Sequence, residues 1–292
     1  MTDGPTGSTV PRRQLGRQLR DLRNRARLTV KAAANALEWS EAKIWRIETG
    51  QTALRSLDVE AMCRVYGAPQ NLARGLMVLA KETKARGWWH SYGDAILEGF
   101  DLYIGLEDSA SQLWWYASEL VPGLLQTEAY ARTVIQPGGW SAEETERRVR
   151  MRIARQALLT RVTAAPTVRV AFSEAVLRCP VGGEEVMAGQ LERLMEAMDY
   201  PNVSIRVIPF EAGLHPGLQC GPFVMMRFPT LGDGREMEPP TVYKDGLTGA
   251  LYLDKPQEIA SYDAAFDAIW TAAASEARSK SLLHEAAREF QK

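Results

Sequence analysis

The sequence predicts a multidomain chain: an all-α N-terminal domain of about five helices, followed by an α+β C-terminal domain with a mixed sheet and flanking helices. Length is the first reason, because 292 residues are enough for two domains. Second, apolar residues recur at helical spacing up to about Arg86, and helical and alternating patterns mix after it. We therefore expect a flexible tail over 1–10, a helical domain over 11–87 and an α+β domain over 88–292.

The third reason is a change in the sign of the charge along the chain. Residues 1–90 hold 16 Lys and Arg against 8 Asp and Glu, a net of +8, whereas residues 91–292 hold 19 against 28, a net of −9. The sum recovers the net charge of −1 for the whole chain. A basic first third joined to an acidic remainder suggests that the first third meets an anionic polymer.

Composition excludes several classes of protein. The chain is 46% hydrophobic and 24% charged, as in an ordinary globular protein, and no apolar run reaches the roughly 18 residues of a membrane span. The polar start MTDGPTGSTV lacks the apolar core of a signal peptide. Cys63, Cys179 and Cys220 are odd in number and far apart, which fits a reducing cytoplasm. No Cys or His pair has metal-ligand spacing, so we expect no metal site. We also expect no cofactor and, because no apolar run is long enough, no membrane contact.

The first helix is expected to begin near Pro11 and to be strongly basic. Seven arginines lie between Arg12 and Arg27, against the single acid Asp21. The apolar residues of this helix fall on one stripe: Leu15, Leu19 and Leu22. The arginines fill the other faces, where they are candidates for contacts with phosphates.

Two short helices are expected to follow. Thr29 can cap the first of them, whose buried face is rich in alanine and allows another helix to approach closely. After the turn at 38–40, Ser40 can cap the next helix, and Trp39 can pack on Ile44 as a hydrophobic staple. Gly50 can adopt the left-handed conformation that ends this helix.

Two short helices joined by a three-residue turn, inside a bundle of about five, are typical of a helix-turn-helix. This motif places the start of its second helix in the DNA major groove. Ile44 and Ile47 are expected to face the core, so the remaining side chains point toward the groove: Glu41, Ala42, Lys43, Trp45 and Arg46.

These side chains suit different DNA contacts. Arg46 can donate two hydrogen bonds to guanine O6 and N7, and Glu41 can accept one from cytosine N4. Ala42 permits close approach or contact with a thymine methyl, and Lys43 suits a phosphate or a base edge. Trp45 has two open interpretations: contact with DNA, or packing on the second helix or on a dimer mate. The other residues expected to touch DNA are Thr29, Lys31, Ser40 and Arg55.

The stretch LTVKAAANALEWSEAKIWRIETG, residues 28–50, resembles the Xre/Cro-type helix-turn-helix, usually L-T-Q-x-x-L-A-x-x-L-G-x-S-x-x-x-I-S-R-I-E-x-G. The matching residues are Leu28, Thr29, Ala33, Leu37, Ser40, Ile44, Arg46, Ile47, Glu48 and Gly50. Val30 stands where a glutamine often contacts DNA, so the resemblance leaves the operator open. Glu38 replaces the turn glycine and must adopt a conformation that glycine finds easier, at a cost of about 1 kcal/mol.

The remaining two hundred residues predict an alternation of strands and helices. Strands are expected at 112–118, 167–172, 203–210, 221–228, 241–246 and 249–253. Helices are expected at 124–135, 141–161, 184–198, 256–274 and 275–292. The segment RGWWHSY, 86–92, is expected to be a junction whose two tryptophans pack between the domains.

No compact constellation of catalytic residues appears in this domain, so we do not expect an enzyme. Cys179 and Cys220 have no histidine nearby in the sequence and are interpreted as buried apolar residues. The loops VPGLLQT and HPGL combine Gly and Pro with apolar residues. We hypothesise that a partner or ligand contacts the domain there, at Leu125, Gln126, His215 and Pro216.

Longer stretches, among them VPGLLQTEAYAR, RRVRMRIARQALLTR and PNVSIRVIPFEAGLHPG, resemble the C-terminal domain of actinomycete Xre-type regulators of the WhiJ type. The resemblance covers about residues 12–288. It implies a cytoplasmic, nucleoid-associated DNA-binding regulator whose C-terminal domain has no assigned chemistry. Members are often encoded beside a small protein, and such pairs are described as toxin–antitoxin-like or as developmental regulators.

The sequence as a whole predicts a sequence-specific transcriptional regulator, a repressor of its own gene. Double-stranded DNA is the expected partner, and a homodimer is expected because two-fold pairing reads two half-sites. The C-terminal domain is expected to respond to a small partner protein or a small ligand. The alternative is an antitoxin-like interaction protein that mainly neutralises a small partner protein encoded nearby.

Overall fold

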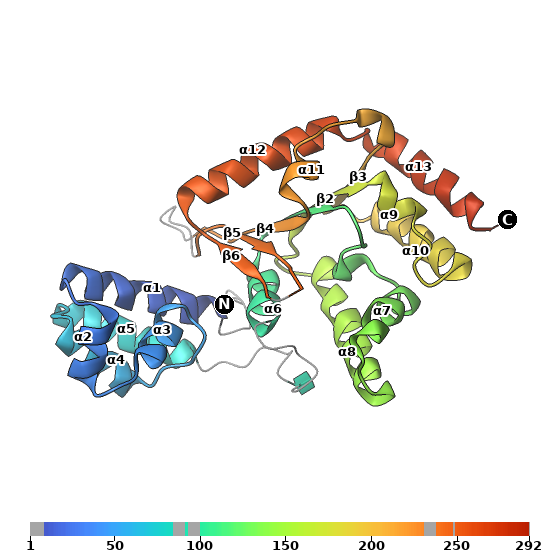
Figure 1. Ribbon diagram of the computed structural model, residues 1–292. Coiled ribbons are helices and arrows are strands. Elements are labelled where there is room, and N and C mark those ends of the chain that lie inside the picture. The colour runs from blue at the N-terminus through green and yellow to red at the C-terminus, as the bar shows by residue number, and fades with distance from the viewer. Residues whose placement is uncertain (1–8, 84–90, 93–99, 231–237, 248, 292) are drawn as a thin grey trace. The chain divides into compact units, whose positions relative to one another are not determined.

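The chain divides into two compact units in the computed structural model, which describes residues 9–83, 91–92, 100–230, 238–247 and 249–291 (Figure 1). The described residues of the first unit are 9–83, 91, 100–109, 229–230 and 238. Those of the second are 92, 110–228, 239–247 and 249–291. An all-helical N-terminal region followed by an α+β region with a mixed sheet is confirmed. The tryptophans expected at the junction lie outside the described residues.

The described helices of the first unit are α1 (Thr9–Arg25), α2 (Val30–Leu37), α3 (Glu41–Glu48), α4 (Ser56–Val65), α5 (Gln70–Glu82) and α6 (Phe100–Ser109). Thr29 and Ser40 cap α2 and α3 as predicted. Each hydroxyl accepts a hydrogen bond from the backbone N–H three residues ahead, at 3.1 and 3.2 Å. Glu38 ends α2 with a φ of 57°, and Gly50 follows α3 with a φ of 75°, so both positions are left-handed as expected.

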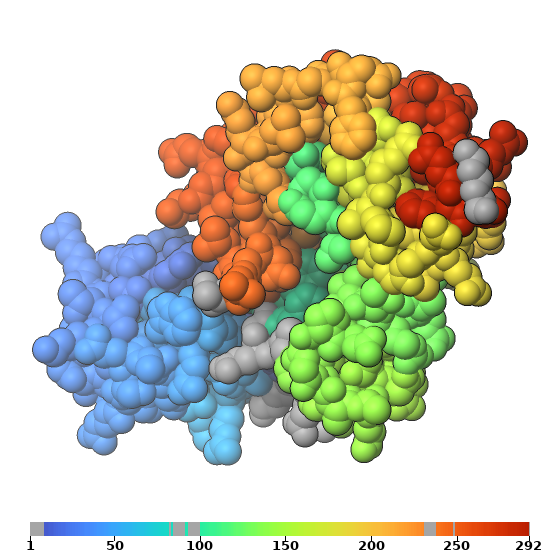
Figure 2. Space-filling model, turned by 45° about the vertical axis from the view of Figure 1, so that its right-hand side comes forward, coloured from blue at the N-terminus to red at the C-terminus, as the bar shows by residue number. Residues whose placement is uncertain are grey.

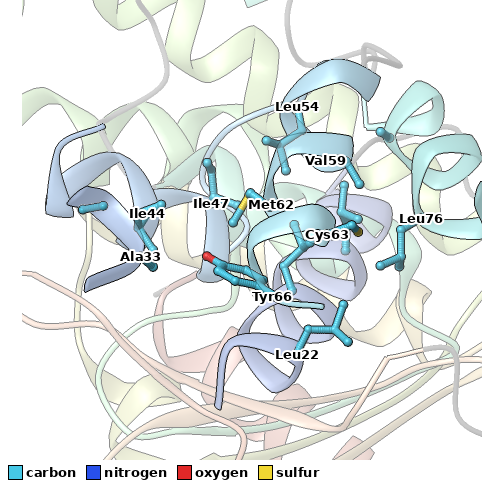
Figure 3. Packing of buried hydrophobic residues seen from close by; sticks show 14 residues of the cluster. Leu22, Ala33, Ile44, Ile47, Leu54, Val59, Met62, Cys63, Tyr66 and Leu76 are labelled. Carbon is cyan, nitrogen blue, oxygen red and sulfur yellow. The ribbon is translucent and has the colours of Figure 1, made fainter. Parts of the chain in front are cut away.

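One apolar core joins α1 to α5. Ile44 and Ile47 are fully buried and project from α3 into this core, where they meet Leu15 and Leu19 of α1. Figure 3 shows the side chains of α3, α4 and α5 gathered in the same cluster, with Met62 beside Ile47. Burial of this face fixes which side of α3 remains available to solvent.

The sixth helix was not predicted from the sequence, and it belongs to the first unit. Residues 103–109 are all buried, Glu107 and Asp108 among them, so polar residues in α6 do not mark a solvent-facing stripe. A Cβ added to Gly105 would lie 1.8 Å from the Thr9 hydroxyl, which shows how closely α6 approaches the start of α1. A single domain boundary at residue 87 therefore does not describe the two compact units.

The described residues of the second unit contain a six-stranded sheet of order β3-β2-β1-β4-β5-β6. Its strands are β1 (Gln112–Ala117), β2 (Thr167–Ser173), β3 (Val203–Ile208), β4 (Phe223–Arg227), β5 (Thr241–Lys244) and β6 (Leu251–Leu253). β1, β2 and β3 pair in parallel, and helical connections join them, as parallel pairing requires. β4 pairs antiparallel with β1 and β5, and β6 pairs antiparallel with β5.

The helices of the second unit are α7 (Glu128–Ile135), α8 (Ala142–Arg155), α9 (Glu174–Arg178), α10 (Glu184–Ala197), α11 (Gly217–Cys220), α12 (Pro256–Ala272) and α13 (Glu276–Glu289). Within residues 110–228 its 3-10 turns are η2 (Gly123–Leu125), η3 (Gln136–Gly138), η4 (Gln156–Thr160) and η5 (Phe210–Ala212). The helix expected over 124–135 is interrupted because Thr127 caps α7. One face of the sheet packs against α12 through Phe266 and Ile269, as the long helix over the strands in Figure 1 shows.

Candidate DNA-binding surface and C-terminal sites

Four of the five side chains predicted to face DNA on α3 are exposed. Glu41, Ala42, Trp45 and Arg46 lie on the surface, opposite the two buried isoleucines. Trp45 is 54% exposed and does not belong to the apolar core of this unit. Its exposed indole surface is open to contact with DNA or with a dimer mate.

Lys43 is engaged within the protein. Its Nζ lies 3.3 Å from the centroid of the Trp39 ring and 3.8 Å from the carboxylate of Asp58. Trp39 itself packs against the apolar core, as the staple prediction requires. Lys43 therefore covers the start of α3 by a cation–π contact, and any contact with a phosphate has to compete with these neighbours.

The other predicted DNA-binding residues surround the two helix starts. Thr29, Lys31, Ser40 and Arg55 are all exposed. The Thr29 and Ser40 hydroxyls already cap α2 and α3. Free N–H groups at the start of a helix favour anions, so these positions together offer donors and positive charge to a phosphate backbone.

Four of the seven arginines in and after α1 act inside the first unit rather than on its surface. Arg12 donates to the backbone carbonyl of Thr83 at 2.9 Å, and burial lowers its pKa. Arg13 and Arg17 both pair with the fully buried carboxylate of Glu238, at 2.8 and 2.6 Å. The arginines left for phosphate contacts are Arg20, Arg25 and Arg27, because Arg23 is also used internally.

The pair of Arg23 and Glu48 fixes the far end of α3. Two parallel hydrogen bonds of 2.6 and 2.7 Å join the buried guanidinium to the buried carboxylate. Arg23 also donates to the carbonyl of Leu28, and its hydrogen bonds to Glu48 raise its pKa. Burial, and then the Glu48 charge, raise the pKa of Tyr66. In the sequence, Glu48 of the R-I-E-x-G motif was the only sign of this pair, and it was assigned no structural role there.

The residues expected to contact a partner on the second unit are mostly interior, which corrects that hypothesis. Leu125 and Gln126 are buried, and Gln126 donates to the carbonyl of Val121 at 2.6 Å and accepts from Arg152 at 2.9 Å. Pro216 is half-buried. Loops rich in Gly and Pro were expected to be exposed, but these side chains hold the loops to the domain.

His215 is also a packing residue. Its ring meets Tyr116 edge-on with centroids 5.7 Å apart, and its Nδ1 accepts the N–H of Gly217 at 3.2 Å. Burial lowers the pKa of His215, which favours the neutral ring that can accept this hydrogen bond. A Cβ at Gly217 would lie 2.4 Å from the Tyr116 ring, so glycine is needed where the loop crosses it.

The surface of the same loop is apolar. Phe210, Leu214 and Leu218 are 63%, 80% and 61% exposed, on the segment from η5 to α11. This segment, amber in Figure 2, lies at the surface of the second unit. The Gly/Pro pattern therefore indicated a loop with exposed apolar side chains. The exposed side chains are Leu214 and Leu218, which flank the predicted His215 and Pro216.

The cysteines are all free. Cys63 is buried, but Cys179 is exposed and Cys220 is half-buried, so the interpretation of both as buried residues is wrong for Cys179. Within the described part of the chain, no three His, Cys, Asp or Glu side chains are placed to hold a metal ion. None of the described helices is long and apolar enough to cross a membrane.

Comparison with known proteins finds two family models that match separate parts of the chain. A family model described as a helix-turn-helix domain matches residues 14–76, from α1 into α5. A second model, described as a domain of unknown function (DUF5753), matches residues 100–285. No curated protein and no solved structure matched. The second model covers well over half of the 292 residues of this chain. The chain therefore belongs to the DUF5753 family, and it joins that domain to an N-terminal helix-turn-helix.

Proposed function

We propose that this protein is a sequence-specific DNA-binding regulator of the WhiJ type that represses its own gene. The supporting observation is the exposed face of α3, where Ala42, Trp45 and Arg46 carry no internal role among the described contacts while the opposite face is buried. A guanidinium on the groove side of a recognition helix is suited to guanine O6 and N7. The sequence match to a helix-turn-helix domain supports the same proposal.

DNA recognition in this proposal divides among the exposed residues. Arg46 reads a guanine, Glu41 a cytosine, and Trp45 packs on a sugar or a thymine methyl. Lys31, Arg55 and the starts of α2 and α3 hold the phosphates, which fixes the register of α3 on the duplex. Two copies of the chain bind two half-sites about one helical turn apart.

The Arg46 side chain provides the test of this proposal. Full-length protein should prefer the DNA upstream of its own gene to scrambled DNA, and Arg46→Ala should remove that preference. Arg64→Ala is the matched control, because Arg64 is exposed on α4 in the same unit, off the recognition helix. Equal effects of the two substitutions on both DNAs would contradict a reading role for α3.

We also propose that the second unit receives a small partner protein on the apolar loop from η5 to α11. Exposed apolar side chains close together on a surface mark interaction sites in many proteins. Phe210, Leu214 and Leu218 provide such a surface. The same loop is the specific feature that favours the alternative function, in which neutralising this partner is the main activity of the chain.

Leu214→Ser combined with Leu218→Ser should weaken binding of the proposed small partner protein at least tenfold, about 1.4 kcal/mol. The reason is the loss of two apolar anchors from the interface. Val162→Ser, at an exposed position of the same unit, is the control. The partner's affinity is measured by titration calorimetry with full-length protein. An unchanged affinity in the double variant would show that the loop is not the contact surface.

A further inference from the structure

Three arginines gather on the sheet face that α12 covers. Arg169, Arg206 and Arg227 come from β2, β3 and β4, and all three are half-buried. Trp114 lies directly opposite Arg169 and Met225 in the strand pairings, and Met225 belongs to the core under α12. Residues opposite each other in a sheet share a face, so the register itself brings these charges together.

A stack of aromatic rings supports the guanidinium groups. Trp114 stacks on Phe266 with centroids 5.2 Å apart, and Phe266 stacks on Trp270 at 5.7 Å. Arg227 lies 4.8 Å from the Trp114 ring and Arg206 lies 4.6 Å from the Trp270 ring. Arg169 is within reach of both indoles, at 5.4 and 5.7 Å. These contacts hold three positive groups along one short row of rings.

The arginines outnumber their counterions. Among the described residues, one carboxylate pairs with them, that of Asp263 with Arg227. Arg206 donates weakly to the carbonyl of Trp270 at 3.4 Å, and the Nε atoms of Arg206 and Arg227 are buried without a hydrogen-bond partner among the described residues. Buried donors in folded proteins are almost always satisfied, by protein, water or an ion. An anionic acceptor would therefore balance the positive charge and satisfy these buried donors.

We propose that Arg169, Arg206 and Arg227 form a binding site for a small oxyanion, a phosphate or carboxylate group of a small molecule. Guanidinium groups recognise both through paired N–H donors. The indole faces are already covered by Phe266 and by the arginines, so the rings orient the guanidinium groups and do not stack on the ligand. The alternative is purely structural, in which the arginine stems only cover the aromatic rings.

This site goes beyond the contact of a partner with the apolar loop. The sequence led us to expect that the second unit responds to a partner protein or to a small ligand; this site is where such a ligand binds, and that regulatory link rests on the proposed function. Anion binding itself is independent of DNA. It is measured on the protein alone, so its failure would leave the DNA-binding proposal untouched.

The test is titration calorimetry of full-length protein with inorganic phosphate and, separately, with citrate, at constant ionic strength. We expect saturable binding of at least one anion and a change in tryptophan fluorescence, because Trp114 and Trp270 contact the arginines. Tighter binding of phosphate assigns the site to phosphorylated molecules, and tighter binding of citrate assigns it to carboxylates. No saturable binding of either anion by the wild-type protein would overturn the proposal.

Arg169→Met keeps an apolar side chain over the indoles but removes the charge, so it should lower the affinity for the anion at least tenfold. Arg288→Met, at an exposed arginine of α13, should leave binding unchanged. Arg169→Lys keeps the charge without the planar fork and should bind at an intermediate level, which also covers the case in which the methionine variant does not fold. Equal binding by the Arg169 and Arg288 variants would show that the row of arginines is only structural.

Discussion

Glu48→Ala is expected to destabilise the helix-turn-helix unit by about 3–5 kcal/mol, the usual cost of removing one partner of a buried ion pair. Glu48 and Arg23 are both buried, and two short hydrogen bonds join them. The substitution leaves the Arg23 guanidinium in the interior without its carboxylate. Because the pair joins the end of α1 to the end of α3, the loss of stability should be largest in the recognition helix.

Hydrogen exchange of the full-length protein measures this effect locally. Peptides within residues 15–65 of the Glu48→Ala variant should exchange much faster, whereas peptides from β2 and β3 should be unchanged. Glu60→Ala is the control, because Glu60 pairs with Arg64 across 3.9 Å on the surface, where such pairs contribute at most about 1 kcal/mol. If both variants exchange alike, the buried pair does not hold α3.

Gly16→Ala should destabilise the same unit even though alanine is the better helix former by about 1 kcal/mol. Gly16 lies in α1 where α3 crosses it. A Cβ there would lie 2.4 Å from the carbonyl oxygen of Ile47 and 3.0 Å from the backbone of Glu48. Backbone atoms cannot rotate away, so the two helices must separate, and overpacking of this kind costs about 1–3 kcal/mol.

Gly75→Ala is the matched control for Gly16→Ala. Gly75 lies in α5, and a Cβ there would meet no atom within 4 Å. This substitution should therefore stabilise the unit by roughly 0.5–1 kcal/mol through helix propensity alone. Urea unfolding followed by circular dichroism at 222 nm compares the two. Shifts of opposite sign are expected, and a stabilised Gly16→Ala protein would mean that α1 and α3 do not meet as described.

Local patterns in the sequence predicted the DNA-binding motif because its determinants are local. The caps at Thr29 and Ser40, the left-handed Glu38 and the buried isoleucines of α3 each depend on a few neighbouring residues. The α6 helix was missed for the opposite reason. Its residues 103–109 are buried without a break, the polar Glu107 and Asp108 among them, so its polar residues do not mark one exposed face.

Long-range partners explain what the sequence did not predict. Counting arginines suggested a phosphate-binding helix, but Arg13 and Arg17 pair with Glu238, more than two hundred residues away in the chain. The residues expected to contact a partner are mostly buried, and His215 packs on Tyr116 from β1, whereas the exposed apolar side chains of that loop are Phe210, Leu214 and Leu218. The arginines of the proposed anion site lie on three different strands, so only the strand order brings them together.

Fluorescence anisotropy of the full-length protein, on the DNA upstream of its own gene and on scrambled DNA, tests the central claim most directly. The measurement is made at two salt concentrations, with Arg46→Ala and Arg64→Ala alongside the wild type. We predict that the upstream DNA binds at least tenfold tighter, and that Arg46→Ala alone loses about 1–3 kcal/mol of this preference. Equal, weak and strongly salt-dependent binding of both DNAs by the wild type would contradict sequence-specific regulation through α3.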